Sequence, residues 1–332
     1  MQEGKKGIFV ISLDFELHWG VSDHFSPEEY AGNLNNTPKA IDGILQIFNA
    51  NNIHCTWATV GMLFCKNKAE LFEYVDESKR PVFKNPQLSN YLHAEKAGDN
   101  EHVDPYHYGL SIIKKISNYP NQEISTHTFS HYYCLEEPIN PPGFEADIKA
   151  AIVVGQRNNF SLKSIVFPRN QVLEANLDAC AKEGIVCYRG TQNTWFHKPV
   201  TQKNEKKIFK RIFRLSDHYF NLTGSNGYDM GKILQPYSVK NIPQSRFLRP
   251  YSKKISILER FRVNRIKKEM TSAARSGKMY HLWWHPHNFG NDVEGNLNVL
   301  AQIIAHFKWL ENKYGMKSMT MLEVYNNFFA KK

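Results

Sequence analysis

The feature that most constrains the fold of this chain is a repeated alternation of short apolar segments with longer amphipathic ones. Residues 7–13, GIFVISL, form a run of strand-forming residues. Residues 37–52 then place apolar side chains at a helical spacing, with Thr37 and Pro38 as the expected helix start. Residues 53–60 are again typical of a strand. The opening of the chain is therefore predicted to be strand, helix, strand.

The same alternation continues to the end of the sequence. Further strands are expected at 122–126, 163–167, 185–190, 279–285 and 317–321. Further helices are expected at 108–119, 145–158, 172–184, 255–277, 296–315 and 322–329. This order predicts an α/β fold with a mainly parallel sheet or barrel covered by helices. In such folds the functional side chains gather at the carboxyl ends of the strands.

Composition agrees with one folded unit. The 332 residues are 42% hydrophobic and 22% charged, as in globular proteins, and no repeat or long linker divides them. We therefore expect a single domain over residues 1–332. No run approaches the roughly 18 apolar residues of a membrane span, and the N-terminal apolar run is too short for a secretion signal. The five cysteines lack a C-x-x-C pattern and suit free thiols, so a cytoplasmic location is expected.

The formal charge of +10 is concentrated in two basic segments, expected as insertions near 198–214 and 246–276. An ordinary solvated surface is one explanation of such segments. The other is attraction for an anion, such as a diphosphate-linked sugar or the inner membrane surface. No nucleic-acid-binding motif accompanies the charge, so a nucleic-acid partner is not expected. The sequence leaves the oligomeric state open.

Polar side chains follow five of the predicted strands at the point where each strand ends. They are Asp14 and Glu16, His127 and His131, Arg169, Arg189, and His285 and His287. Because parallel strands end at one edge of a sheet, we expect these side chains to meet there. This convergence is stronger evidence for a site than any one of the short motifs.

A metal centre is one prediction from these residues. His127 and His131 are four apart, so on a helical turn they would face the same way and could share a metal ion, although a lone HxxxH also arises by chance. Asp14 and Glu16 are two apart, so on a strand both project from one face. One could bind the metal while the other accepts a proton. His285 could donate a proton to a leaving amine, or could be an ordinary core histidine.

With these residues the chain resembles a known family, the polysaccharide deacetylases, also called the NodB-homology domain or carbohydrate esterase family four. Five motifs occur in the family's order between residues 12 and 286: SLDFE, STHTFSH, FPRN, YRGTQNTWF and LWWHP. The resemblance implies a distorted (β/α) barrel of about seven parallel strands. It also implies a general base Asp14, a general acid His285, and the metal ligands Glu16, His127 and His131.

Other site residues follow from the same resemblance. It implies that Arg169 orients the base, that a backbone amide near Asn170 helps to hold an oxyanion, and that Trp195 borders an acetate pocket. Arg189, Trp283 and His287 are expected to contact substrate. The chain also departs from the family: Glu16 is longer than the usual aspartate, Arg169 follows its proline instead of preceding it, and Asn193 stands where an aspartate is usual.

The function implied is a metal-dependent hydrolase that removes an N-acetyl group, or less commonly an O-acetyl group, from a sugar of a surface-glycan precursor such as O-antigen or capsule. A metal-bound water would be the nucleophile. Zinc suits the ligands best, and cobalt, nickel or manganese would also be accepted. One alternative is another C–N hydrolase that opens a cyclic amide or removes a formyl group. A second is a catalytically silent glycan-binding domain.

Overall fold

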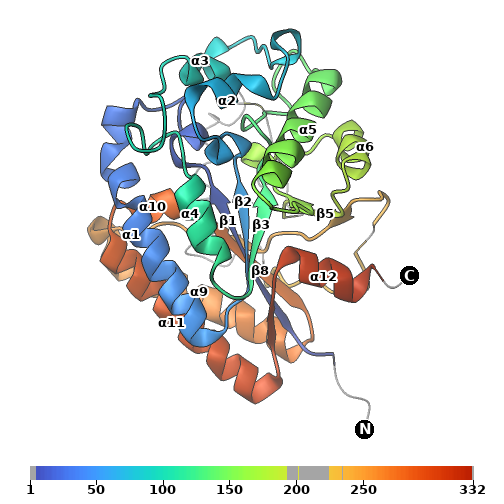
Figure 1. Ribbon diagram of the computed structural model, residues 1–332. Coiled ribbons are helices and arrows are strands. Elements are labelled where there is room, and N and C mark those ends of the chain that lie inside the picture. The colour runs from blue at the N-terminus through green and yellow to red at the C-terminus, as the bar shows by residue number, and fades with distance from the viewer. Residues whose placement is uncertain (1–4, 193–200, 202–223, 234, 331–332) are drawn as a thin grey trace.

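The computed structural model describes residues 5–192, 201, 224–233 and 235–330. Its centre is a single sheet of nine strands, and every strand pairing in it is parallel (Figure 1). The strands are β1 (Ile8–Phe15), β2 (Cys55–Thr59), β3 (Gln122–Thr126), β4 (Ser164–Ile165), β5 (Cys187–Tyr188), β6 (Lys240–Asn241), β7 (Arg246–Phe247), β8 (Met279–Trp284) and β9 (Lys317–Met319). The predicted α/β class with a parallel sheet is thereby confirmed.

The sheet has two more strands than the seven expected. Seven strands lie where the sequence predicts them, and the additional ones are β6 and β7, each of two residues. The equally short β4 and β5 lie within the apolar runs at 163–167 and 185–190, whereas β6 and β7 lie in a segment of mostly polar residues that gives no strand pattern. The strand order is β6-β5-β4-β3-β2-β1-β8-β7, and β9 pairs with the start of β1.

The sheet curls because its two edges are joined by a short piece of chain. β6 and β7 lie at opposite ends of the strand order, yet only residues 242–245 separate them. Within this piece the Gln244 amide donates to the Gly190 carbonyl at 2.9 Å, and the Ser245 amide donates to the His281 carbonyl at 2.8 Å. The piece therefore ties the two edges together and bends the sheet into a barrel.

Helices cover the outside of the curled sheet. In Figure 1, α1, α9 and α11 lie on one side of the sheet, while α5 and α6 lie on the other. The helices are α1 (Pro27–Asn51), α2 (Lys68–Glu73), α3 (Asn90–Ala94), α4 (Leu110–Ser117), α5 (Pro141–Arg157), α6 (Glu174–Lys182), α9 (Ser256–Arg275), α10 (Pro286–Phe289), α11 (Val293–Tyr314) and α12 (Met321–Phe328). In the described part of the chain, no helix combines the length and the apolar composition of a membrane span.

Helix α1 begins ten residues before the position that the sequence predicted. The prediction took Thr37 and Pro38 as the helix start, but the structure places both inside α1. The start is at Pro27, because Ser26 and Glu29 form a reciprocal capping box around it. The Thr37 hydroxyl donates to the carbonyl of Asn33 at 2.9 Å near the proline. The helix continues through Pro38 to Asn51.

Strand β1 has two buried faces that contact different parts of the core. Its odd-numbered apolar residues, including Phe9 and Leu13, pack in the large cluster beneath the outer helices. Ile8 and Val10 face a smaller cluster inside the barrel, which α12 also joins. Side chains alternate along a strand, so Asp14 shares the inner face of Ile8 and Val10. The barrel interior thus changes from apolar at the start of β1 to polar at its end.

The basic segment near 246–276 supplies strand β7 and helix α9, and part of its charge is neutralised internally. Arg246 donates to both carboxylate oxygens of Glu269, at 2.8 and 2.7 Å. Arg265 also donates to Glu269, at 3.2 Å, and Arg262 pairs with Glu259. These five side chains are buried. Only the exposed lysines and arginines of this segment therefore remain to attract an anion. The other basic segment, 198–214, lies outside the described residues apart from Thr201.

Candidate active site

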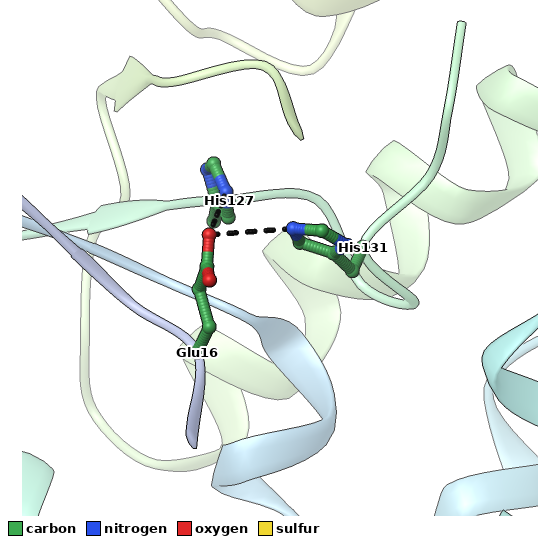
Figure 2. Close-up of side chains that lie close together, drawn as sticks. All are labelled: Glu16, His127 and His131. Atoms are coloured by element: carbon green, nitrogen blue, oxygen red, sulfur yellow. Dashed lines mark hydrogen bonds and ion pairs between the residues drawn. The ribbon is translucent and has the colours of Figure 1, made fainter. Parts of the chain in front are cut away.

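Three side chains from two strand ends converge on one point inside the rim of the barrel. Glu16 follows β1, while His127 and His131 follow β3. The Glu16 Oε1 atom is 2.9 Å from His127 Nε2 and 3.3 Å from His131 Nε2, and Figure 2 shows the two imidazoles directed at this oxygen. All three side chains are buried. This group of potential ligand atoms is compact enough to hold a metal ion.

The two histidines do not lie on a helical turn, which corrects the prediction from their spacing. Residues 127–131 form an irregular loop in which Thr128 and His131 have positive φ angles of 64° and 57°. Asp147 on α5 holds this loop, because its carboxylate accepts hydrogen bonds from the amides of Phe129, at 2.7 Å, and Ser130, at 3.1 Å. The Ser130 hydroxyl donates to the same carboxylate. The loop, together with Asp147, therefore brings the imidazoles together.

Hydrogen bonds on the far side of each imidazole favour metal binding. His127 Nδ1 donates to the carbonyl of Val166 at 2.7 Å, so in neutral His127 the Nε2 lone pair faces Glu16. His131 Nδ1 is 3.1 Å from the Tyr133 hydroxyl, and burial lowers the pKa of His131 although Glu16 opposes that shift. A lone pair directed at a carboxylate is unfavourable unless a cation lies between them. The donor set therefore fits a divalent metal.

The distances agree with this interpretation. Tetrahedral zinc has ligand bonds of about 2.0–2.1 Å, which places its ligand atoms about 3.3 Å apart. The observed separations of 2.9 and 3.3 Å are close to that value. Burial disfavours the charged form of Glu16, but the charge of His285 and the two imidazoles beside the carboxylate outweigh burial and hold the pKa of Glu16 well below its usual range. A carboxylate ligand is thereby available.

Gly20 makes room for the longer acid at position 16. A Cβ atom added to Gly20 would lie 1.7 Å from Glu16 Oε2 and 2.8 Å from Glu16 Cβ. Gly20 ends the short 3₁₀ helix that begins at Leu17, immediately after Glu16. The absence of a side chain there allows the Glu16 carboxylate to turn back toward the histidines. This close approach explains how a glutamate fits where the resembling family usually has an aspartate.

Asp14 is held by a buried arginine from another strand end. Arg189 follows β5, and its Nη1 and Nη2 atoms donate to Asp14 Oδ1 and Oδ2, each at 2.7 Å. Arg189 also donates to the Ser12 hydroxyl at 3.0 Å, and its guanidinium lies 4.1 Å from the centre of the Trp283 ring. Ser12 contacts His281. Burial, followed by the charge of Arg189, lowers the pKa of His281 to about 3, so this histidine is neutral. The position of Asp14 is therefore tightly fixed.

Arg189, and not Arg169, makes the contact with Asp14 that was expected of Arg169. Arg169 was expected to orient Asp14, but it pairs with Asp23 at 2.5 Å and stacks over Tyr133 at 4.3 Å. Arg189 was expected to contact substrate, but it is fully buried against Asp14. The reason lies in the turn after β4, where Arg169 has a positive φ of 53° and its side chain reaches Asp23 instead.

Asn170 is also engaged differently from the expectation. Its backbone amide donates to the carbonyl of Phe167 at 2.8 Å, so this amide is occupied and does not face an oxyanion. Its side-chain oxygen accepts a hydrogen bond from Arg189 Nη2 at 3.2 Å. Asn170 therefore helps to hold the arginine that holds Asp14.

His285 lies beside both acids, as the convergence of strand ends predicted. It follows β8, and its Nε2 atom is 3.7 Å from Asp14 Oδ2 and 3.6 Å from Glu16 Oε1. Its Nδ1 atom is 3.2 Å from the Asn288 side-chain amide. His285 remains partly exposed, whereas the acids are buried. Together with these acids it forms a second compact group of potential metal ligands.

The three remaining predicted site residues are Trp283, His287 and Trp195. Trp283 is partly exposed, with its ring centre 5.5 Å from that of His285. His287 is buried beneath His285 with the rings stacked at 5.2 Å, and burial and then the charge of His285 lower the pKa of His287 to about 3. His287 is therefore a neutral support for His285. Trp195 lies outside the described residues.

Sequence reasoning missed the residues that support the site. These are Asp147, Tyr133, Gly20, Ser12 and His281. Ser12 is the first residue of the motif SLDFE, and the other four lie outside the five motifs. Each acts through a contact that only the folded chain brings about. Spacing alone gives no signal for such contacts.

Comparisons with known proteins bear on the fold. No protein-family model and no curated protein matches the sequence. A provisionally assigned polysaccharide deacetylase from Mycobacterium smegmatis is 12% identical over 100% of this chain and 93% of its own, with a TM-score of 0.61. PuuE allantoinase is 10% identical over 98% and 92%, with a TM-score of 0.56. The 4-alpha-glucanotransferase of Thermococcus litoralis is 10% identical over 98% and 41%, with a TM-score of 0.54.

At these identities the likeness shows a shared fold. The chain is a curled α/β barrel similar to that of the M. smegmatis protein, in agreement with the architecture implied by the sequence motifs. At the carboxyl ends of its strands it carries a buried cluster of histidine and carboxylate side chains that could bind a metal.

Proposed function

We propose that this protein is a metal-dependent hydrolase that removes an N-acetyl group from a sugar. The observation that carries the proposal is the convergence of Asp14, Glu16, His127, His131 and His285 at one rim of the barrel. Two carboxylates and three imidazoles within this space provide a cation site, a proton acceptor and a proton donor. Hydrolysis of an amide by water requires all three functions.

The roles divide according to the contacts of each side chain. Glu16, His127 and His131 would hold the cation through one carboxylate oxygen and two Nε2 atoms. Asp14 is fixed by Arg189 and is left as the carboxylate that accepts a proton from the attacking water. His285 lies within 3.7 Å of Asp14 and donates a proton to the nitrogen as the C–N bond breaks. The products are acetate and a free amine.

A bound divalent cation would polarise the amide carbonyl and make water easier to deprotonate. Zinc suits two histidines and one carboxylate, and cobalt, nickel or manganese would suit the same ligands. The chain's own contribution is to orient the ligands through Val166, Tyr133 and Asp147.

For the substrate we propose a surface-glycan precursor with an acetylated sugar, carried on a diphosphate in the cytoplasm or at the inner membrane surface. The support is the formal charge of +10 and the exposed basic residues near α9, such as Lys253, Lys254 and Arg260. An O-acetyl sugar is the second choice of substrate. A diphosphate-linked sugar should be turned over faster than the same free sugar, and equal rates would remove this part of the proposal.

A related C–N hydrolase is the runner-up. The fold likeness to PuuE allantoinase favours considering a cyclic amide as substrate. The same acid, base and cation would serve ring opening, and no acetate would be released. A formyl amide would be distinguished by release of formate.

The experiment that tests the proposal combines metal analysis with product analysis. The purified full chain is analysed for bound metals and then supplied with N-acetylated nucleotide sugars and oligosaccharides, while acetate is quantified. We expect about one metal ion per chain and acetate release that a chelator abolishes and added metal restores. A chain that binds no metal, or that with bound metal opens cyclic amides and releases no acetate, would contradict the proposal. Metal without any turnover would favour a glycan-binding role.

A further inference from the structure

Six ring-bearing side chains form a continuous row across the candidate site. In order they are Phe25, Tyr30, His287, His285, Trp283 and Phe247, and this set is called the aromatic row. Successive ring centres are 5.3, 5.7, 5.2, 5.5 and 4.7 Å apart. The row begins at the start of α1, passes α10 and the end of β8, and reaches β7. His285 is an inner member, with rings on both sides.

The Phe25 end of the row is built by the start of α1. Ser26 is the N-cap of this helix, so Phe25 and Tyr30 occupy the positions of a hydrophobic staple. Their rings stack with an interplanar angle of 20°. A staple alone requires only that the two side chains touch each other. It does not explain why Phe25 remains 45% exposed at the edge of the site.

The backbone of Phe25 is held at both its amide and its carbonyl. The amide donates to the carbonyl of Val21 at 3.0 Å, and His18 Nε2 donates to the carbonyl of Phe25 at 3.0 Å. His18 Nδ1 must therefore accept a hydrogen bond from His107 Nε2, at 2.9 Å, and His107 Nδ1 donates to Asp104 at 2.7 Å. This chain of hydrogen bonds, in which His18 and His107 are buried, fixes the loop. Phe25 is thus a rigid exposed ring, which loses little conformational freedom when a ligand binds.

The charges around Phe25 indicate which class of ligand could bind to this exposed ring. Glu28 and Glu29 follow Phe25 and are exposed, whereas Asp23, which precedes it, is paired with Arg169. This acidic setting repels an anionic membrane surface and a diphosphate group. A neutral ligand with an apolar face and many hydroxyl groups fits, because its C–H groups can lie on the ring while its hydroxyls bond to the polar neighbours. A pyranose ring has this chemistry.

We infer that Phe25 and Tyr30 form a sugar-binding subsite on one side of His285, so that the substrate is an oligosaccharide extending along the aromatic row. The inference rests on the proposed function, whose site it extends. Trp283 and Phe247, both partly exposed, provide the corresponding surface on the other side of His285. The acetylated sugar then lies at His285, and a neighbouring sugar of the same chain lies on Phe25. A monosaccharide would not reach Phe25.

The test compares substrate lengths in two matched variants. Acetate release is measured for N-acetylglucosamine oligomers of one to five sugars with the wild type, Phe25→Ala, Phe25→Trp and Trp309→Ala. Trp309 on α11 is the control, because it is 44% exposed and stacks on His306 outside the row. We expect Phe25→Ala to raise KM about tenfold for the longer oligomers, with kcat and the monosaccharide rate unchanged. Phe25→Trp should restore KM, and Trp309→Ala should match the wild type.

Equal loss for monosaccharide and oligomers, or no loss with any oligomer, would overturn the subsite. Circular dichroism melting checks that Phe25→Ala remains folded despite the lost staple. If the wild type releases no acetate from any oligomer, the proposed function fails, and binding of the tetramer by isothermal titration calorimetry tests the subsite separately. Binding that weakens about tenfold in Phe25→Ala alone would support it. Equal affinity in all variants, or no affinity in any, would overturn it.

Discussion

Arg189 and Asp14 form a buried ion pair in which two guanidinium nitrogens each contact one carboxylate oxygen at 2.7 Å. The arginine comes from the end of β5 and the aspartate from the end of β1. A bidentate pair fixes the plane of the carboxylate as well as its position. The proposed general base is therefore oriented by Arg189, whereas Arg169 pairs with Asp23.

Replacing Arg189 by lysine should reduce acetate release by about 100-fold, because one ammonium group cannot contact both oxygens and a misplaced base loses about that factor. Bound metal should remain near the wild-type level, since Arg189 does not contact the proposed ligands. Arg169→Lys is the matched control and should change the rate only a few-fold. Steady-state kinetics with metal analysis would check this. The reverse ranking of the two variants would return the orienting role to Arg169.

Adding a methyl group at Gly20 should weaken metal binding. The new Cβ would lie 1.7 Å from Glu16 Oε2, so the carboxylate must move away from the histidines. We expect the metal dissociation constant to rise at least about tenfold in Gly20→Ala, as measured by competition with a chelator. Gly32→Ala is the control, because a Cβ there meets nothing within 4 Å. Unchanged affinity in Gly20→Ala would argue against Glu16 as a ligand.

Asp147→Asn should loosen the loop that carries His127 and His131. An amide keeps one oxygen acceptor but turns its NH₂ group toward a backbone or hydroxyl donor, so at least one of the three hydrogen bonds is lost. Metal affinity should fall about 10- to 100-fold, in the range seen for groups that orient metal ligands. Glu145→Gln on the same helix is exposed and should bind metal normally. Titration calorimetry with the metal alone would decide; equal affinities would exclude a role for Asp147.

Acid should remove the stabilisation that Asp104 contributes. Burial opposes its charge, but the hydrogen bond and charge of His107 and the amides of Gly98 and Tyr106 outweigh burial and lower the pKa of Asp104. A lowered pKa in the folded state means that the stabilisation is present above the unfolded value of about 3.9 and is lost as pH falls through the folded value.

Asp104→Asn should therefore lower the free energy of unfolding by about 1 kcal/mol at pH 7, a modest value because Asp104 is only half-buried. The difference from the wild type should shrink as pH falls below about 4. Urea unfolding at pH 7 and pH 3.5 measures both values. A difference in the free energy of unfolding that grows toward acid pH would contradict the predicted direction of this pH dependence.

Much of the fold and the site could be predicted because both follow from periodicity. The alternation of strand and helix patterns determines a parallel sheet, and a parallel sheet places its strand ends at one rim. For this reason Asp14, Glu16, His127, His131 and His285 lie together as their sequence positions predicted. Strands β6 and β7 were not predicted because, unlike the equally short β4 and β5, they do not lie within apolar runs.

What the sequence could not show depends on contacts between distant residues. Thr128 has a positive φ angle that its β-branched side chain disfavours, so the loop that carries His131 depends on Asp147 from a later helix. Arg169 and Arg189 both follow strands, and only the folded chain determines which of them meets Asp14. The start of α1 is a different case, because the Ser26–Glu29 capping box could have been recognised from the sequence and was missed.

The most direct test of the central claim compares the wild type with Asp14→Asn in the same assay. An asparagine keeps one oxygen for Arg189, and circular dichroism verifies that the variant is folded. Metal content and acetate release from an N-acetylated oligosaccharide are measured on each preparation. The account predicts equal metal, near one ion per chain, and a rate about 10²- to 10⁴-fold lower in Asp14→Asn. Equal metal with a wild-type rate would contradict the assignment of Asp14 as the general base.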